Sequence, residues 1–371
     1  MGQEEWEACK APIMSGWITQ GPQVEAFENL FAELHQVKHS IAVSNCTTAL
    51  HLALLAIGIG PGDEVIVPAF TWISTANAVI YCGATPVFVD IDLQTFNIDP
   101  EKLKSAITTK TKAIIPVHLF GLCANLDKIK TYAPNLPLIE DAACSAGAMF
   151  KGKYSGSLGE IGCFSFHPRK SISTGEGGMI TTNNDEYAEL IRKLRNHGAS
   201  ISEEQRHKGP KPYILPEFNL VGYNYRMTDI QGAIGFVQLK KLNKFIDQRN
   251  IWAEYYSNNL SDIKWLTTPK QSDNYRHGWQ SYVMLLNPKI SPISRNEFME
   301  LLQSKGIATR PGTHAVHMLN YYKLKYSIDE NEFPNSKFAD QNSVAIPLHN
   351  LMDKSDFDYI INTILNINNY I

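Results

Sequence analysis

Short apolar runs alternate with segments of helical periodicity along the first 200 residues. The apolar runs predict buried strands at residues 41–44, 64–68, 86–90, 113–118, 138–141, 163–166 and 179–182. Between them, apolar residues recur at helical spacing, as at Leu50, Leu54 and Ile57 in a helix predicted over 47–57, and again over 73–81. Such alternation is typical of βαβ units. We therefore expect an α/β fold with a mostly parallel central sheet and helices on both of its faces.

The pattern changes after residue 200. Residues 202–217 are polar and contain three prolines, which predicts a surface loop. A long helix is predicted over 228–260, with Thr228 as its N-cap. The remainder mixes a strand with helices, predicted at 282–286, 294–305 and 355–368. We interpret the chain as two domains that divide within the long helix, a large α/β domain of residues 1–245 and a smaller C-terminal α+β domain of residues 246–371.

Composition and charge narrow the class of protein. The 371 residues carry 34 Lys and Arg against 37 Asp and Glu, a net charge of −3, and no basic stripe stands out. We therefore expect no nucleic-acid partner. The acidic start and the lack of an 18-residue apolar run predict neither a secretory signal nor a membrane span. None of the six cysteines form a C-x-x-C pair, so we expect reduced thiols in a cytoplasmic protein, without a metal site.

A carboxylate stands where a predicted buried strand ends, at Asp141 in the segment Leu138-Ile139-Glu140-Asp141. In parallel α/β sheets, ligands bind beyond the carboxyl ends of the strands. Asp141 is therefore either the N-cap of a following helix or a group that holds a ligand, and taken alone the local pattern favours the cap.

Lys170 lies in a polar loop between the strands predicted at 163–166 and 179–182. A single lysine in a loop is usually a solvated surface charge. Here Pro168 precedes it and the glycine-rich segment 175–178 follows it, which indicates a loop of defined conformation. Because Asp141 and Lys170 each follow a predicted strand, we expect both at the same edge of the sheet.

Two further positions suit a phosphate-bearing aromatic ligand. Hydroxyl residues, Thr47 among them, stand where a strand is followed by a helix, whose first N–H groups can bind phosphate; an ordinary Ser/Thr cap is the equal alternative. Trp72 follows the predicted strand 64–68 and either stacks on a ligand ring or is a core aromatic. An amine, an acid, an anion cradle and a stacking ring together are what pyridoxal 5′-phosphate (PLP) requires.

The chain also resembles the DegT/DnrJ/EryC1/StrS family of sugar-nucleotide aminotransferases, which have the aspartate aminotransferase fold (fold type I). The resemblance covers nearly the whole chain. Its motifs are GWITQGPQVEAFE (16–28), SNCTTALHLAL (44–54), GDEVIVPAFTW (62–72), EDAACSAGA (140–148), CFSFHPRKSISTGEGGM (163–179), GYNYRMTDIQGAIG (222–235) and HMLNYY (317–322).

The resemblance implies a role for particular residues. Lys170 matches the lysine that carries PLP as a Schiff base, and Asp141 matches the partner of the pyridine nitrogen. The other implied contacts are Trp72 on the ring, Thr47 and Ser165 on the phosphate, and Asn224 on the phosphate of the other subunit of a homodimer. His167, Arg226 and His317 match positions near the substrate. In two places the chain departs from the family: Cys46 replaces a common glycine beside the phosphate, and Cys144 replaces Gln, His or Glu near the ring oxygen of the cofactor.

The implied activity is transfer of an amino group from L-glutamate to a nucleotide-linked keto-deoxysugar. The segment SFHPRKSISTGEGGM resembles members that aminate C4 of a 4-keto-6-deoxyhexose, and amination of C3 is the alternative. Related sugar dehydratases have a histidine in place of Lys170, and a non-catalytic regulatory protein would not require this set of residues.

Overall fold

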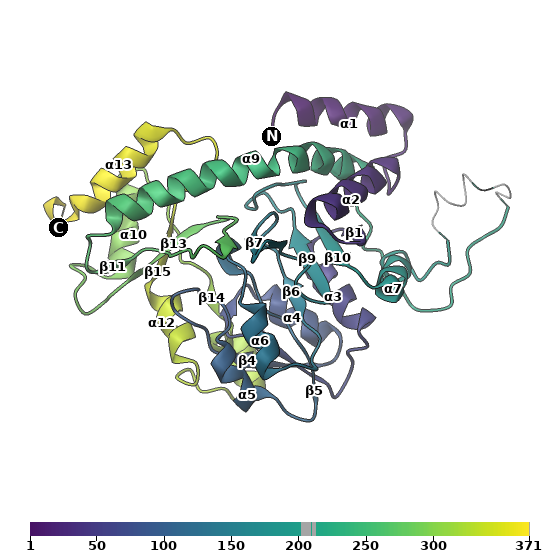
Figure 1. The fold of residues 1–371 in the computed structure, drawn as a ribbon, viewed down its shortest axis with the longest axis horizontal. Helices are drawn as coiled ribbons and strands as arrows, with labels where there is room; N and C mark the ends of the chain where they lie inside the picture. The colour runs from purple at the N-terminus through teal and green to yellow at the C-terminus, as the bar shows by residue number, and fades with distance from the viewer. Residues whose placement is uncertain (202–208, 210–212, 371) are drawn as a thin grey trace.

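The computed structural model describes residues 1–201, 209 and 213–370, so most of the predicted surface loop 202–217 lies outside the described residues. The chain forms an elongated molecule with the long helix α9 (Asp229–Leu260) running along it (Figure 1). The predicted N-cap of this helix is confirmed, because the Thr228 hydroxyl accepts a hydrogen bond from the N–H of Gln231 at 3.3 Å.

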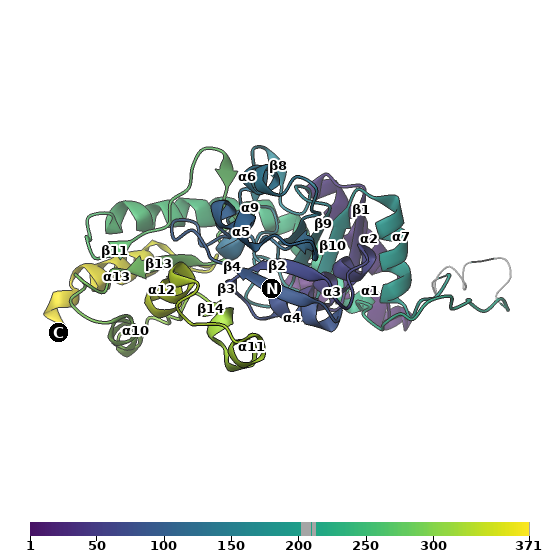
Figure 2. The ribbon, with the colours of Figure 1, turned by 90° about the horizontal axis from the view of Figure 1, so that it is seen from below.

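A central sheet forms the middle layer of the large half of the molecule (Figures 1 and 2). Its strands are β1 (His39–Val43), β2 (Glu64–Pro68), β4 (Thr85–Val89), β5 (Thr111–Ile114), β6 (Ile139–Asp141), β9 (Ile161–Ser165) and β10 (Gly178–Thr182). They pair in the orders β1-β10-β9-β6 and β4-β2-β5, and parallel bridges from Ile114 to Leu138 and from Val117 to Asp141 join the two groups. Of these strands, β10 alone runs in the opposite direction to the others, so the predicted mostly parallel sheet is confirmed.

Helices cover both faces of this sheet because strand side chains alternate between the faces. Ile41 and Val43 of β1 belong to the core beneath α3 (Cys46–Ala56), α4 (Ser74–Tyr81) and α7 (Asp185–Arg195). Ala42, between them, belongs to the core beneath α2 (Pro22–His35) and the first half of α9. α1 (Gln3–Ser15) packs outside α9 (Figure 1), and α5 (Leu103–Ala106) and α6 (Leu126–Tyr132) pack near β4 and β5.

Glycines set the close packing of α2 against α9. A Cβ on Gly232 would lie 2.6 Å from the backbone nitrogen of Val24, and one on Gly235 would lie 2.5 Å from the ring of Phe27. Real Cβ atoms do not approach so closely, so a larger residue at either position would push the helices apart.

The C-terminal part has a separate antiparallel sheet of β11 (Leu266–Thr267), β13 (Tyr282–Leu286) and β15 (Ser343–Ile346). Residues from the second half of α9, α10 (Arg295–Ser304) and α13 (Lys354–Leu365) share one core with it. The remaining elements are β3 (Phe70–Thr71) with β14 (His314–Ala315), β7 (Met149–Phe150), β8 (Lys153–Tyr154), β12 (Tyr275–Arg276), α11 (Asn320–Tyr326) and α12 (Pro334–Asn342). The domain division at residue 245 stays a prediction.

Candidate active site

Lys170 lies in the loop that joins the antiparallel strands β9 and β10. Hydrogen bonds from the N–H of Phe166 to the carbonyl of Gly177 (2.8 Å) and from Thr174 to the carbonyl of Phe166 (3.0 Å) hold the base of this loop together. The Lys170 side chain is half-buried, and its Nζ donates to the Sγ of Cys144 at 3.2 Å. Lys170 is therefore held in a defined position and is not a freely solvated surface charge.

Asp141 ends β6, the parallel neighbour of β9, and pairs with Cys163 across that ladder. The two strands thus bring Asp141 and the Lys170 loop to the same edge of the sheet, as expected. No helix begins after Asp141, so the N-cap interpretation is wrong. Asp141 is 4% exposed, and its carboxylate accepts from the Thr75 hydroxyl at 2.8 Å and from the N–H of Ala143 at 3.2 Å.

Electrostatics single out Asp141 as a carboxylate that needs a cation. Burial raises its pKa above the ordinary value, although the Thr75 hydrogen bond and the charge of Lys170 both lower it. A positively charged ligand group close to this carboxylate would lower its pKa again.

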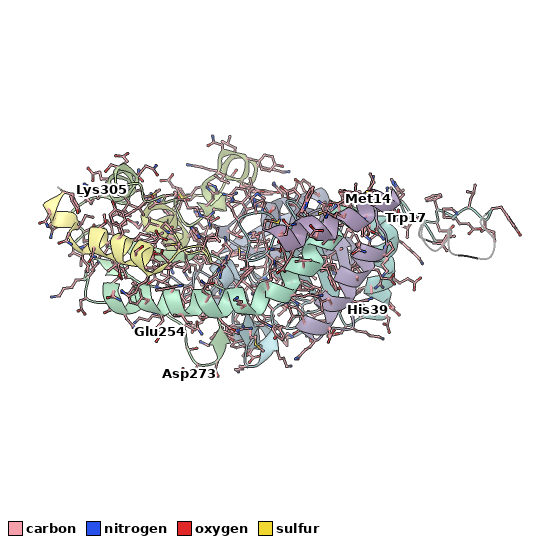
Figure 3. All side chains as sticks on the ribbon, turned by 90° about the horizontal axis from the view of Figure 1, so that it is seen from above. Met14, Trp17, His39, Glu254, Asp273 and Lys305 are labelled. Atoms are coloured by element: carbon pink, nitrogen blue, oxygen red, sulfur yellow. The ribbon has the colours of Figure 1, made fainter. Side chains whose placement is uncertain are left out.

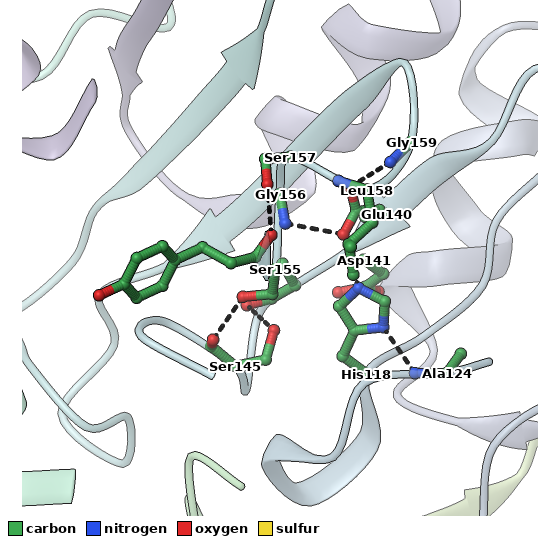
Figure 4. Close-up of polar contacts among 12 residues, drawn as sticks. His118, Ala124, Glu140, Asp141, Ser145, Ser155, Gly156, Ser157, Leu158 and Gly159 are labelled. Atoms are coloured by element: carbon green, nitrogen blue, oxygen red, sulfur yellow. Dashed lines mark hydrogen bonds and ion pairs between the residues drawn. The ribbon is translucent and has the colours of Figure 1, made fainter. Parts of the chain in front are cut away.

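A second carboxylate, Glu140, lies next to Asp141 on the same strand and is fully enclosed (Figure 4). It accepts hydrogen bonds from the N–H groups of Gly156 (2.7 Å), Leu158 (2.8 Å) and Gly159 (2.6 Å) and contacts His118 Nε2 at 2.7 Å. His118 Nδ1 accepts from the N–H of Ala124 at 3.1 Å, so the imidazole proton belongs on Nε2 and is donated to Glu140. Every lone pair that Glu140 presents is thus satisfied by protein, which makes it structural.

The N-terminus of α3 follows β1 and lies at the same edge of the sheet, where β10 separates β1 from β9. Its N-cap is Asn45, whose side chain accepts from the N–H of Thr48 at 2.9 Å, so Thr47 is not the cap. In the described part of the chain, no acceptor takes the N–H groups of Cys46 and Thr47. A Cβ on Gly178 would lie 2.6 Å from the Asn45 carbonyl, so glycine is needed there. These two free N–H groups at a helix start suit a phosphate.

Trp72 follows β3 and is 53% exposed, so the core-aromatic interpretation is wrong. Its ring centroid lies 5.6 Å from that of His314, which pairing of β14 with β3 places beside it. Sequence reasoning missed His314, because only the β3–β14 pairing brings it to Trp72.

Cys46 and Ser165 lie close to the same sheet edge. The Cys46 thiol is buried and donates to the carbonyl of Cys163 at 3.5 Å, and burial raises its pKa well above the ordinary value. Ser165 ends β9, and its hydroxyl accepts from the N–H of His167 at 3.4 Å. The Cys46 side chain therefore points into the protein and leaves its backbone N–H for a ligand.

The remaining predicted residues have different surroundings. Asn224 is exposed, and Arg226 donates to the side chain of Asn196 at 2.6 Å. His317 is fully buried, with Nε2 3.3 Å from the carbonyl of Glu330, and it does not line the cavity beside Lys170. Their roles stay predictions.

A cavity of about 730 Å³ lies between the Lys170 loop and the C-terminal part of the chain. Its lining includes Arg169, Arg249, Arg310, His349 and Tyr359. Asp141, Thr47 and Trp72 do not line it, so it adjoins the predicted cofactor site without coinciding with it. Sequence reasoning missed Arg310, which the C-terminal part of the chain supplies.

These residues fit PLP. The Asp141 carboxylate is buried and forms no ion pair with the described residues, the start of α3 offers unpaired N–H groups, and the indole of Trp72 is exposed. Among the described residues, no helix is long and apolar enough to cross a membrane, and His, Cys, Asp and Glu nowhere gather in a group that could hold a metal ion.

Known proteins resemble this chain over almost its entire length. It is 42% identical over 349 residues to the GDP-perosamine synthase of Caulobacter vibrioides (93% of this chain, 90% of the relative) and 39% identical over 370 residues to the spore coat polysaccharide biosynthesis protein SpsC of Bacillus subtilis (99% and 95%).

Solved structures are similar as well. An aminotransferase from Psychrobacter cryohalolentis superposes with a TM-score of 0.94 at 30% identity, covering 100% of this chain and 98% of that one. The putative sugar aminotransferase Spr1654 of Streptococcus pneumoniae, in its PLP-form, superposes with a TM-score of 0.88 at 28% identity (98% and 95%). Fold type I is thereby confirmed, and PLP is confirmed as the cofactor at the level of the family.

The model of the DegT/DnrJ/EryC1/StrS aminotransferase family matches residues 1–365. The members of this family are aminotransferases, which confirms the expected aminotransferase activity. The chain belongs to the DegT/DnrJ/EryC1/StrS aminotransferase family.

Proposed function

We propose that this protein is a PLP-dependent aminotransferase that moves an amino group from L-glutamate to C4 of a nucleotide-linked 4-keto-6-deoxyhexose. The observation that carries the proposal is the half-buried Lys170, held at 3.2 Å from Cys144 at the same sheet edge as the buried Asp141. Membership of an aminotransferase family supports the reaction class.

Each residue of the site has a task in this proposal. When bound, PLP would hold the amino group between the two halves of the reaction and withdraw electrons from the reacting carbon. Lys170 would attach the cofactor and then move a proton as a general base. Asp141 would keep the ring nitrogen protonated, since its buried carboxylate gains most from a cation.

The phosphate would lie at the start of α3, against the N–H groups of Cys46 and Thr47 and the Ser165 hydroxyl. Trp72 would stack on the ring with its exposed indole. Cys144 would lie near the ring oxygen, next to Lys170.

The sugar acceptor is supported by the relatives. One is a GDP-perosamine synthase at 42% identity, and another is a spore coat polysaccharide biosynthesis protein at 39% identity. A nucleotide-linked sugar is therefore the acceptor class, and its aminated product would serve surface polysaccharides such as an O-antigen. The segment around Lys170 supports C4 over C3.

A cytoplasmic homodimer with shared sites completes the proposal. Asn224 is exposed, as a residue that reaches another subunit must be. Apolar side chains are also exposed around α1: Trp6 (59%), Ile13 (53%) and Met14 (84%). Met14 and Trp17 lie on the side of the molecule away from Lys305 (Figure 3). Burying the apolar side chains of α1 in a dimer would remove their contact with water.

Borohydride reduction of the PLP-loaded protein tests the reaction class. The reduced cofactor should be recovered on Lys170, and Lys170→Ala should bind the cofactor without covalent attachment and lose transamination. Recovery on another lysine would refute the assignment.

A panel of substrates tests the position of amination. Matched 3-keto and 4-keto deoxysugar nucleotides are offered to the enzyme, and kcat/KM is compared. A preference for the 3-keto substrate would move the proposal to C3 while the reaction class stands.

A further inference from the structure

A chain of two buried hydroxyl groups leads from the strand that precedes Trp72 to the carboxylate of Asp141. Thr71 of β3 and Thr75 in the first turn of α4 lie with their Oγ1 atoms 3.0 Å apart, and Thr75 Oγ1 donates to Asp141 Oδ2 at 2.8 Å. Thr71 is 1% exposed and Thr75 is 0% exposed, so both hydroxyls are enclosed by protein. These two bonds connect β3 and α4 to the acid that ends β6.

The direction of the chain follows from the donors available. A hydroxyl carries a single proton, and an ionised carboxylate only accepts hydrogen bonds. Because Thr75 gives its proton to Asp141, the hydrogen bond between the two threonines must be donated by Thr71. Both bonds then point toward the carboxylate, and the bond from Thr71 polarises the Thr75 hydroxyl and strengthens its donation.

The chain opposes the effect of burial on Asp141. Burial raises the pKa of this acid, and the Thr75 hydrogen bond is the strongest of the contacts that lower it. The N–H of Ala143 and the charges of Lys170 and His118 lower the same pKa less. A hydrogen bond to the charged form of an acid favours that form. The hydroxyl chain thus holds Asp141 toward its ionised state, which is the state that a protonated ring nitrogen needs as its partner.

The same chain fixes the carboxylate relative to Trp72. Successive side chains of a strand point to opposite sides, so Thr71 at the end of β3 is enclosed while the neighbouring Trp72 is 53% exposed. The Asp141 carboxylate is held at both oxygens, since Oδ2 accepts from Thr75 and Oδ1 accepts from the N–H of Ala143 at 3.2 Å. Each oxygen keeps a second lone pair for a ligand. The orientation of the carboxylate is therefore set by the protein, from the same backbone that presents the indole.

We propose that Thr71 and Thr75 are positioning residues that keep Asp141 ionised and oriented toward the ring nitrogen of the cofactor. The inference rests on the proposed role of Asp141 and adds to it the two residues that maintain this role. Both act through the carboxylate and not through contact with the substrate. Without their hydrogen bonds the enclosed carboxylate becomes a stronger base and takes the proton from the ring nitrogen, so that the ring withdraws electrons less well.

The protonation of the ring nitrogen is the direct readout. PLP carrying an isotope label at its ring nitrogen is bound to the protein, and the nitrogen chemical shift is measured by solid-state NMR. The loaded wild type should give the shift of a protonated ring. Thr75→Val keeps the branched shape of threonine but removes the hydroxyl, so the signal should move toward that of an unprotonated ring. Thr75→Ser keeps a hydroxyl and should restore the wild-type signal.

Thr71→Val tests the outer bond and serves if Thr75→Val does not fold. It leaves the Thr75 donor in place, so the signal should move in the same direction by less. In the double variant it should move no further than in Thr75→Val, because the outer bond acts only through the inner one. Thr182→Val is the matched control, since it removes a hydroxyl, 2% exposed, that donates to the carbonyl of Glu160 at 2.9 Å. It should leave the signal unchanged.

Turnover gives a second readout. A loss of ring protonation slows the chemical step and leaves the substrate contacts intact. Thr75→Val should therefore lower kcat about 10-fold and change the KM for L-glutamate less than about 2-fold. Thr71→Val should lower kcat by a smaller factor, about 3-fold.

The outcomes separate this inference from the proposed function. If the ring nitrogen of the loaded wild type is unprotonated, the proposed role of Asp141 fails and the inference fails with it. If the wild-type ring is protonated and Thr75→Val gives the same signal, the inference alone is refuted, whatever the turnover of the variant. An equal change in Thr182→Val would refute it as well, since any buried hydroxyl of the sheet would then have the same effect.

Discussion

The Nζ of Lys170 donates a hydrogen bond to the Sγ of Cys144 at 3.2 Å, although the two residues come from different loops of the sheet edge. Cys144 follows β6, and Lys170 follows β9, the parallel neighbour of β6. Cys144 and Cys9 are partly exposed, and the other four thiols are buried. A thiol accessible to solvent is therefore placed in contact with the lysine that would attach the cofactor.

Alkylation of Cys144 should block attachment of the cofactor. A carboxamidomethyl group from iodoacetamide would occupy the space beside Lys170, and bound PLP should in turn shield the thiol. We expect PLP loading to slow the labelling of Cys144 by at least about 10-fold, with peptide mapping as the measurement. Cys9 is the internal control, since its labelling should not depend on PLP; equal labelling of Cys144 with and without the cofactor would contradict the predicted site.

Asp141→Asn should separate function from stability. The pKa of this acid is raised in the folded protein, so its ionised form costs stability above the pKa of the unfolded state. Without PLP, the variant should be as stable as the wild type at pH 7 or more stable, while transamination falls at least about 100-fold. Urea unfolding and turnover are measured on the same preparations. A clear loss of stability with turnover intact would make Asp141 structural.

Glu140→Gln should show the opposite signature one residue away. The carboxylate accepts from three backbone N–H groups and from His118 Nε2, and an amide would turn a donor toward two of these donors. Each buried donor left unsatisfied costs about 1–3 kcal/mol, so with two such donors the free energy of unfolding should fall by about 2–6 kcal/mol. Glu189→Gln, at an exposed ion pair with Lys193, is the control and should leave stability unchanged. A Glu140→Gln protein of normal stability would show that the network in Figure 4 does not anchor β6.

Glu5 should make the packing of α1 against α9 weaken as the pH falls. Burial alone would raise its pKa, but hydrogen bonds from Lys241, Gln238 and the N–H of Gly2 outweigh burial and lower the pKa to about 2. Because the folded pKa lies below the ordinary value of 4.5, its contribution is complete above that value and is lost as the pH falls toward 2.

The measurement is the free energy of unfolding of wild type and Glu5→Gln against pH. The wild type should exceed the variant by about 1.5–3 kcal/mol at pH 7, and the difference should shrink below pH 4.5. A difference that stays constant down to pH 3 would mean that the Glu5 charge contributes nothing.

Periodicity predicted most of the fold because strands and helices are set by local side-chain patterns. The strand at 64–68 and the strand at 282–286 have the predicted bounds, and α9 begins after the predicted Thr228 cap. The strand predicted at 113–118 is shorter, since β5 ends at Ile114 and the chain continues through single bridges. The helices α1 and α2 had no predicted counterpart; α1 carries a weakly apolar sequence and depends on Glu5 and α9 for its place.

The sequence by itself determined that Asp141 and Lys170 share an edge, because residues that follow neighbouring parallel strands must meet there. Only the tertiary structure decided which side chains touch at that edge. The Cys144 contact, the exposure of Trp72, the neighbour His314 and the arrival of Arg310 from the C-terminal part depend on loop conformations and on packing between segments far apart in the chain. Local patterns indicate which face of an element is buried, but not which distant element covers that face. A site built from several loops depends on how distant elements pack together, so its side-chain contacts follow only from the tertiary structure.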